Sequence, residues 1–194
     1  MGSPTLASTS TAAPEGRQVL VWDLFVRLFH WTLVGCVLAN FTLLEEGEAP
    51  HQWVGYLATG LVLARVAWGF VGSRHARFAS FFPTPRRLKA HVAELRSGRP
   101  PTHLGHNPLG AVMMLALMAL VLSLGLTGWM QGLDAFFGDE WLQELHEGLA
   151  NTLVALAGLH ALAALVMGRL ERTNLIKAMF TGRKQVDAGS RPGA

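Results

Sequence analysis

The stretch that decides the fold class runs from Leu109 to Met130 and reads LGAVMMLALMALVLSLGLTGWM. It contains no charged side chain, and a helix of about 20 residues spans a hydrocarbon core of about 30 Å. Inside lipid, every backbone N–H and C=O group must be paired within its own segment, and a helix achieves this. The stretch is therefore predicted to be a membrane-spanning helix.

Three further apolar runs of similar length lie at residues 25–44, 53–72 and 149–168. The chain of 194 residues is 51% hydrophobic and 15% charged, whereas soluble domains are about 25% charged. The four runs together predict an all-α fold, an integral membrane four-helix bundle that occupies residues 19–184.

The segments outside this domain have a different composition. Residues 1–18 are rich in Ser, Thr, Pro and Ala and lack the apolar core that a secretory signal needs. We expect them to form a disordered tail, and we expect residues 185–194 to form a flexible C-terminal tail. Within the domain, the lone Cys36 excludes an intrachain disulfide, a four-cysteine iron–sulfur cluster and a CxxCH haem attachment.

The charged residues of the connections between the apolar runs are divided by sign. The connections after the first and third runs contain no Lys or Arg, and their acidic residues are Glu45, Glu46, Glu48, Asp134, Asp139, Glu140, Glu144 and Glu147. The basic residues between the second and third runs and after the fourth are Arg74, Arg77, Arg86, Arg87, Lys89, Arg96, Arg99, Arg169, Arg172, Lys177, Arg183, Lys184 and Arg191. Because basic loops stay in the cytoplasm, both termini are predicted to be cytoplasmic and the acidic loops to face outward. The net charge of +3 is therefore the difference between a basic inner side and an acidic outer side. We expect no nucleic-acid partner.

The basic connection contains the segment PTPRRLKAHVAELRSG, residues 83–98. Its Pro-led start, its apolar Leu88, Val92 and Leu95 and its Gly stop predict a short amphipathic helix on the inner lipid surface. The alternative is that the segment is only the positive signal that sets orientation. Asn107 and Pro108 are typical of an N-cap and first turn, and they predict the start of the third spanning helix.

Titratable side chains inside a span indicate function, because lipid makes them costly. His30 and His160 lie roughly 8 to 12 Å from the inner boundary, whereas His51 and His146 lie at the outer one. His146 and His160 are 14 residues apart on one helix, so they share a face at two depths separated by roughly 21 Å. Two imidazoles from facing helices are the ligand set of six-coordinate haem iron. We therefore predict an inner and an outer pair of haem ligands.

The sequence leaves other interpretations of these histidines open. Each His can be a packed or interfacial residue, or part of a proton relay, while zinc or copper would need further ligands. Arg65 lies 14 residues after His51 and therefore on the same helix face, where it is predicted to bind a propionate of the inner haem. The alternative is that Arg65 extends to the inner headgroups. The remaining histidines, His75, His91, His103 and His106, are interpreted as interfacial, with a contact of His106 or Asn107 to a quinone left open.

Several stretches are similar to a known family. They are VWDLFVRLFHWTLV (21–34), HQWVGYLATGLVLARVAWGFVG (51–72), GHNPLGAVMMLALMALVLSLGLTGWM (105–130), HEGLANTLVALAGLHALAALV (146–166) and NLIKAMFTGRK (174–184). Over about residues 19–184 the chain resembles the prokaryotic cytochrome b561 family and the related b-type cytochrome subunits of nickel-iron hydrogenases. The resemblance implies two haem b groups, an outer one on His51 and His146 and an inner one on His30 and His160. It also implies exchange of electrons with a membrane quinone, either ubiquinone or menaquinone.

The leading hypothesis is electron transfer across the bacterial cytoplasmic (inner) membrane through two bis-histidine haems. No general acid, nucleophile or phosphate loop stands out, so bond-making chemistry on a soluble substrate is not expected. The redox partner is predicted to be a periplasmic c-type cytochrome, or another redox protein, that docks on the acidic outer face. One alternative is a membrane-anchor subunit of a larger oxidoreductase such as a hydrogenase, and another is a histidine-based proton channel or transporter. The sequence leaves the oligomeric state open, a homodimer included.

Overall fold

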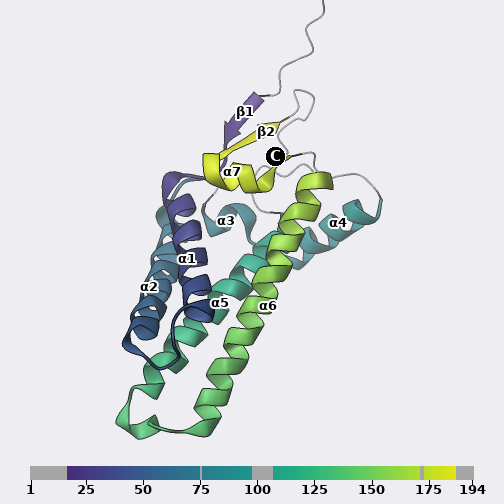
Figure 1. Ribbon diagram of the computed structural model, residues 1–194. Helices are drawn as coiled ribbons and strands as arrows, with labels where there is room; N and C mark the ends of the chain where they lie inside the picture. Colours follow the sequence, from purple (N-terminus) through teal and green to yellow (C-terminus); the bar gives the residue numbers. More distant parts are fainter. Residues whose placement is uncertain (1–16, 75, 98–106, 171–172, 187–194) are drawn as a thin grey trace, which may run out of the picture.

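Four long helices make up most of the structure. The computed structural model describes residues 17–74, 76–97, 107–170 and 173–186. The helices are α1 (Leu24–Thr42), α2 (Ala49–Val71), α5 (Pro108–Gln131) and α6 (Glu140–Leu170). Each of these is long and apolar enough to cross a membrane. The predicted all-α class with four candidate spans is therefore confirmed (Figure 1).

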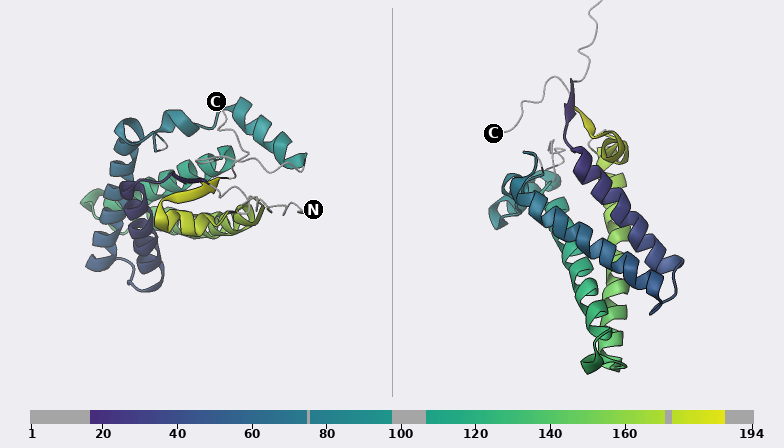
Figure 2. Two further views of the ribbon diagram at one scale, coloured as in Figure 1. Left: turned by 90° about the horizontal axis from the view of Figure 1, so that it is seen from above. Right: turned by 90° about the vertical axis from the view of Figure 1, so that its left-hand side faces the viewer.

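The long helices form two hairpins. α1 packs on α2, α2 packs on α5, and α5 packs on α6. Figure 2 shows α1 beside α2 as one pair and α5 beside α6 as the other. Among the described residues, few backbone contacts join α1 and α6. The start of α1 and the end of α6 nevertheless lie at the same end of the bundle (Figure 1).

The shorter elements lie at one end of the bundle, which we name the basic end. They are β1 (Arg17–Leu20), α3 (Phe78–Phe81), α4 (Pro85–Arg96), α7 (Leu175–Thr181) and β2 (Arg183–Val186). The opposite end, which we name the acidic end, contains the turn at residues 43–48 and the connection at 132–139 with the short helix η1 (Asp134–Phe136). Figure 1 shows both of these connections away from the β-strands.

The two strands extend into segments that the sequence assigned to tails. β1 pairs antiparallel with β2, with Arg17 opposite Val186 and Gln18 opposite Gln185, so the predicted tails at 1–18 and 185–194 overlap the sheet. The sheet joins segments from the two ends of the domain, and a local sequence pattern cannot reveal such a pairing. Residues 1–16 and 187–194 lie outside the described residues.

Gly182 fixes the junction between α7 and this sheet. Its φ of +79° is in the left-handed region, and its carbonyl accepts hydrogen bonds from the N–H groups of Val21 (2.8 Å) and Trp22 (3.1 Å). A Cβ at this position would lie 2.6 Å from the carbonyl oxygen of Trp22. Glycine is therefore required both by the backbone conformation and by the close approach of the backbone that follows β1.

Two of the spanning helices are longer than their apolar runs. α6 begins at Glu140 rather than near residue 149, and α2 begins at Ala49 rather than at 53. The polar residues before each run continue the helix, because hydropathy marks the part that is soluble in lipid and not the part that is helical. As a result His51 and His146, which precede the apolar runs, lie within the helices α2 and α6.

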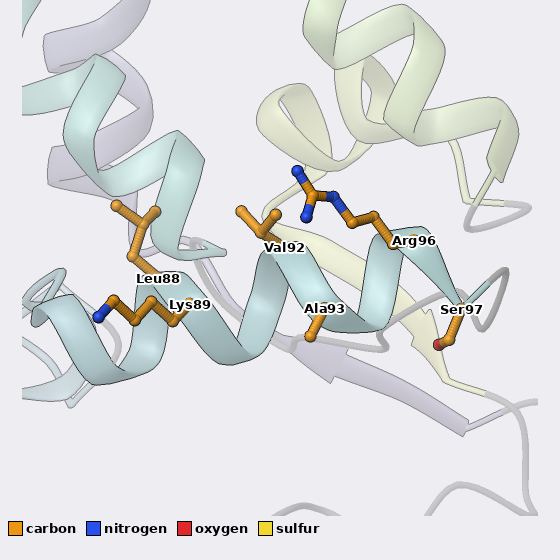
Figure 3. Close-up of a pocket in the computed structure, with 6 residues that line it drawn as sticks. All are labelled: Leu88, Lys89, Val92, Ala93, Arg96 and Ser97. Carbon is orange, nitrogen blue, oxygen red and sulfur yellow. The ribbon is translucent and has the colours of Figure 1, made fainter.

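The amphipathic helix predicted in the basic connection is present as α4. It packs on α5, and Figure 3 shows Leu88 and Val92 projecting from one side while Ala93 and Ser97 point away from it. The predicted cap of the third span is also present, since Asn107 Oδ1 accepts a hydrogen bond of 2.7 Å from the N–H of Gly110. Pro108 follows in the first turn, where its missing N–H costs nothing.

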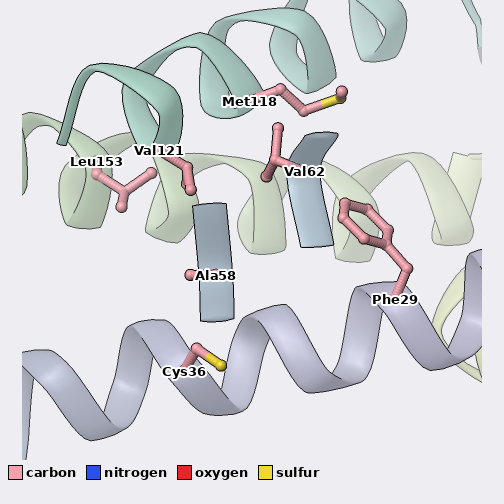
Figure 4. Packing of buried hydrophobic residues seen from close by; sticks show 7 residues of the cluster. All are labelled: Phe29, Cys36, Ala58, Val62, Met118, Val121 and Leu153. Carbon is pink, nitrogen blue, oxygen red and sulfur yellow. The ribbon is translucent and has the colours of Figure 1, made fainter. Parts of the chain in front are cut away.

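A small apolar cluster joins the four long helices. Its buried members are Phe29 and Cys36 from α1, Ala58 and Val62 from α2, Met118 and Val121 from α5, and Leu153 from α6. Figure 4 shows these side chains converging between the helices. Many other large apolar side chains are exposed, among them Leu28, Leu63, Leu126 and Leu159. An outward-facing apolar surface of this kind is suited to lipid rather than water.

Asp23 connects α1 to the end of α2. As the N-cap of α1, its Oδ1 accepts from the N–H of Val26 (2.8 Å), and its Oδ2 accepts from Trp68 Nε1 (3.1 Å) and from Ser73 Oγ. Burial raises the pKa of this carboxyl, but the hydrogen bonds and the charge of Arg65 outweigh that effect and hold the pKa below its usual value. The ionised form of Asp23 is therefore the one that stabilises this junction.

Replacement of Asp23 tests this junction. Asp23→Ala is expected to lower the free energy of unfolding by about 2 kcal/mol, because an N-cap and two charged hydrogen bonds are lost. Since the folded-state pKa is lowered, the stabilisation is full above the ordinary carboxyl pKa of about 3.9 and is lost as the pH falls below it. Thermal unfolding in detergent at neutral and acidic pH measures both effects. Asp134→Ala, an exposed acid, is the control, and equal losses in the two variants would contradict the prediction.

Candidate metal centre

The structure brings two of the predicted histidines close together. His51 of α2 and His146 of α6 lie toward the acidic end, with ring centroids 6.4 Å apart and ring planes inclined by 60°. A metal–imidazole bond is about 2 Å long, and a five-membered ring with bonds of about 1.3 Å has a radius of about 1 Å. Two rings on opposite sides of one metal ion thus have centroids about 6 Å apart. The observed separation fits an axial pair.

The second predicted pair consists of His30 on α1 and His160 on α6. The ring of His30 makes an edge-to-face contact with Trp31, with centroids 5.0 Å apart. Trp31 in turn stacks on Phe180 of α7 at 4.1 Å. His30 is therefore connected through one aromatic neighbour to the basic end of the bundle.

Two of these imidazoles have buried nitrogens whose hydrogen-bonding capacity is unused. Nδ1 of His30 and Nδ1 of His51 are both inaccessible to solvent and have no hydrogen-bond partner among the described residues. A buried polar atom without a partner is costly. An atom of this kind calls for an explanation, and a bound ion or a redox role is one such explanation. Both rings therefore keep their capacity to bind a ligand.

His146 differs from these two rings because a side chain holds its δ nitrogen. Thr127 of α5 places Oγ1 2.8 Å from Nδ1 of His146. A Cβ added at the next residue, Gly128, would lie 3.3 Å from Cε1 of the same ring. The contact between Thr127 and His146 was not predicted from the sequence. The sequence shows only that Thr127 is a polar residue in a span without titratable side chains. It does not show which neighbouring helix the Thr127 side chain faces.

Arg65 is buried, with 1% of its surface exposed. One of its terminal nitrogens donates a 3.0 Å hydrogen bond to the carbonyl of Ala76, and its guanidinium carbon lies 5.5 Å from the ring centre of Phe78. The other terminal nitrogen, NH1, is buried with no hydrogen-bond partner among the described residues. Arg65 is thus held inside the protein with one donor available to an anion.

The number of protein ligands distinguishes a haem site from a zinc or copper site. Within the described part of the chain, no group of three or more His, Cys, Asp or Glu side chains is arranged to hold a metal ion. Zinc and copper sites need three or four protein ligands, whereas a haem needs only the axial ones because the macrocycle supplies the rest. Paired imidazoles therefore fit haem better than a bare metal ion.

Of the remaining histidines, the structure describes His91. His91 is buried on α4 with its Nδ1 3.9 Å from Glu94 Oε2, away from the four histidines of the spans. His75, His103 and His106 lie outside the described residues. The question of a quinone contact at His106 is therefore not addressed by the structure, although Asn107 is occupied as the cap of α5.

A helical membrane bundle whose imidazoles are paired between separate helices defines a class, the multi-pass membrane proteins with histidine-ligated cofactors. The family follows from comparison with known sequences. Residues 21–182 match the family described as prokaryotic cytochrome b561, and the chain belongs to this family. It is a membrane cytochrome of the b type, a haem protein of electron transport, and the resemblance drawn from the sequence is confirmed.

Relatives with curated names agree with this assignment. A probable Ni/Fe-hydrogenase B-type cytochrome subunit of Rhodobacter capsulatus is 28% identical and covers 86% of this chain and 81% of its own length. The protein of the same name from Bradyrhizobium diazoefficiens is 28% identical over 94% of each chain. The one from Azotobacter vinelandii is 30% identical over 66% of this chain and 65% of its own. No solved structure gives a significant match.

The space that Gly128 leaves beside His146 can be tested by filling it. Gly128→Leu is expected to push the His146 ring away from His51 and to lower the haem content of the purified protein, measured as the haem-to-protein ratio. Gly148→Leu is the matched control, because a Cβ at Gly148 of α6 would meet nothing within 4 Å. An unchanged haem content in Gly128→Leu would contradict the expectation that a side chain at position 128 displaces the His146 ring.

Proposed function

We propose that this protein transfers electrons across the bacterial cytoplasmic (inner) membrane through two haem b groups, exchanging them between a membrane quinone and a redox partner. The observation that carries the proposal is the pair of imidazoles of His51 and His146, whose centroids are 6.4 Å apart. In this proposal His51 and His146 hold the outer haem, and His30 and His160 hold the inner one. Ubiquinone or menaquinone is the proposed membrane substrate.

The helix α6 supports the two-site arrangement. It is continuous from Glu140 to Leu170, so His146 and His160 lie on one rigid element at 1.5 Å per residue. Their separation of roughly 21 Å along the helix axis allows two sites at different depths within the membrane. The distance between the two sites is therefore set by a single helix that carries one ligand of each.

The protein's own residues would do three things at these sites. When bound, haem b supplies a reversible one-electron couple. The paired imidazoles would hold the haem iron from the protein side, which would disfavour binding of oxygen or a substrate there. The surrounding apolar helices exclude water, and NH1 of Arg65 offers a charged donor to an anionic group such as a haem propionate. These residues bind, orient and shield, while none of them makes or breaks a covalent bond.

The distribution of charge supports an orientation and a partner. The basic end would face the cytoplasm and the acidic end the periplasm. Glu45, Glu46 and Glu48 are exposed at the turn between α1 and α2. A basic surface on a periplasmic c-type cytochrome is complementary to this turn.

A second candidate is favoured by the relatives. Three related proteins that match this chain are each named a probable Ni/Fe-hydrogenase B-type cytochrome subunit, and two of them match over more than four fifths of both chains. In this version the protein is the membrane-anchor subunit of a larger oxidoreductase such as a hydrogenase. The two candidates share the haem sites and differ in the protein that exchanges electrons with them.

Haem counting tests the ligand assignment. The wild type is expected to contain two haem b groups per chain by pyridine haemochrome analysis, and His51→Ala and His160→Ala are expected to contain one each. Each variant should retain a different haem, because the lost imidazole belongs to a different pair. Difference spectra and redox titration of the two variants identify which one remains.

His103→Ala, in the basic connection, is the control and should keep both haems. Retention of two haems in His160→Ala would show that the inner site uses other residues. A colourless, well-folded wild-type protein would instead favour the histidine-based proton channel or transporter, for which proton flux into vesicles is the measurement.

Charge neutralisation tests the partner. The triple variant Glu45→Gln, Glu46→Gln, Glu48→Gln is expected to slow electron exchange with a basic c-type cytochrome at low salt, and the difference should shrink as salt screens the charges. Stopped-flow absorbance measures the rate. Arg86→Gln with Arg87→Gln, at the opposite end of the bundle, is the control. Equal rates at low salt, combined with copurification of a hydrogenase-type enzyme, would favour the second candidate.

A further inference from the structure

The hydroxyl group of Thr127 lies at the centre of a small hydrogen-bonded group on α5. Its Oγ1 is 3.0 Å from the carbonyl oxygen of Ser123 and 3.2 Å from that of Leu124. It is also 2.8 Å from Nδ1 of His146 on α6. The residue is 6% exposed, so water cannot substitute for any of these partners. Three neighbours therefore share one hydroxyl.

The chemistry of these neighbours decides the direction of each bond. A hydroxyl has one hydrogen to donate, and carbonyl oxygens can only accept. A threonine in a helix commonly donates to the carbonyl four residues before it, as Thr42, Thr59 and Thr152 do here. If Thr127 does the same, its oxygen accepts from His146, and the proton of the imidazole is then on Nδ1. The lone pair of the ring is left on Nε2.

The surroundings keep the ring in this position. Gly128 leaves room for Cε1 of His146, and a side chain there would compete for the same space. By contrast, Nδ1 of His30 and Nδ1 of His51 have no hydrogen-bond partner among the described residues. Within the described part of the chain, Thr127 therefore gives His146 a hydrogen bond at Nδ1 that His30 and His51 lack.

We propose that Thr127 is a positioning residue for the outer haem, which accepts a hydrogen bond from Nδ1–H of His146 and leaves Nε2 to bind the iron. This inference rests on the proposed function, in which His146 is an axial ligand. A hydrogen bond to the far nitrogen of a ligating imidazole fixes its orientation and makes it a stronger electron donor. A stronger donor stabilises ferric more than ferrous iron, so Thr127 lowers the reduction potential of the outer haem.

A redox titration of the complete, haem-loaded protein tests the proposal. Thr127→Val keeps the shape of the side chain and removes the hydroxyl, and it is expected to raise the outer midpoint by about 59 mV. That shift corresponds to a tenfold change for one electron, the lower end of the effects of such supporting residues. The outer midpoint is the one that is absent from His51→Ala. The inner midpoint is expected to stay unchanged.

Two further variants separate hydrogen bonding from packing. Thr127→Ser keeps the hydroxyl and should restore the wild-type midpoint. Thr152→Val removes a hydroxyl that donates to the carbonyl of Gly148 at 2.7 Å on α6, and it should change neither midpoint. If Thr127→Val loses the outer haem altogether, retention of that haem by Thr127→Ser supports the proposal in the same way.

The outcomes distinguish this inference from the proposed function. Two haems with an unchanged outer midpoint in Thr127→Val would overturn the role of Thr127 and leave the proposed function intact. A shift or a loss in Thr127→Ser as large as in Thr127→Val would also overturn it, because packing of the methyl group would then be the cause. A wild-type protein without haem would overturn the proposed function itself.

Discussion

In a lipid environment a polar side chain must find its partner inside the protein, and this constraint arranges the polar residues of all four long helices. The threonines satisfy it locally, since Thr42, Thr59 and Thr152 each donate to the carbonyl four residues earlier. Asp23 satisfies it by accepting three hydrogen bonds where α1 begins. Among the described residues, unsatisfied buried polar atoms remain on Arg27, Trp31 and Asn40 as well as on His30, His51 and Arg65, and we assign only the last three to bound groups.

Features encoded in consecutive residues could be predicted from the sequence. The four spans are long runs of high hydropathy with few charged residues, and the cap formed by Asn107 and Pro108 lies within one turn of its helix. The helix α4 is an amphipathic pattern of a dozen residues. In each case the decisive interactions are between near neighbours or with the surrounding lipid. Family membership was predicted from longer stretches of the same kind.

Features that depend on how the helices pack could not be predicted. The pairing of β1 with β2, the contact of Thr127 with His146 and the hydrogen bond from Arg65 to Ala76 join segments whose relative position is set by the tertiary structure. The depth of each histidine along its helix can be counted from the sequence, and this count grouped His51 with His146. The distance of 6.4 Å between their ring centroids depends on how the helices pack, and their role as ligands stays a prediction.

The sheet between β1 and β2 has a consequence for biosynthesis. A ribosome releases the chain from the N-terminus onward, so β1 and the helix that follows it emerge long before their partner strand. Arg17 cannot pair with Val186 until the whole bundle has been synthesised. The first helix therefore enters the membrane without its final anchor at the basic end, and closing the sheet is a late event in the maturation of the protein.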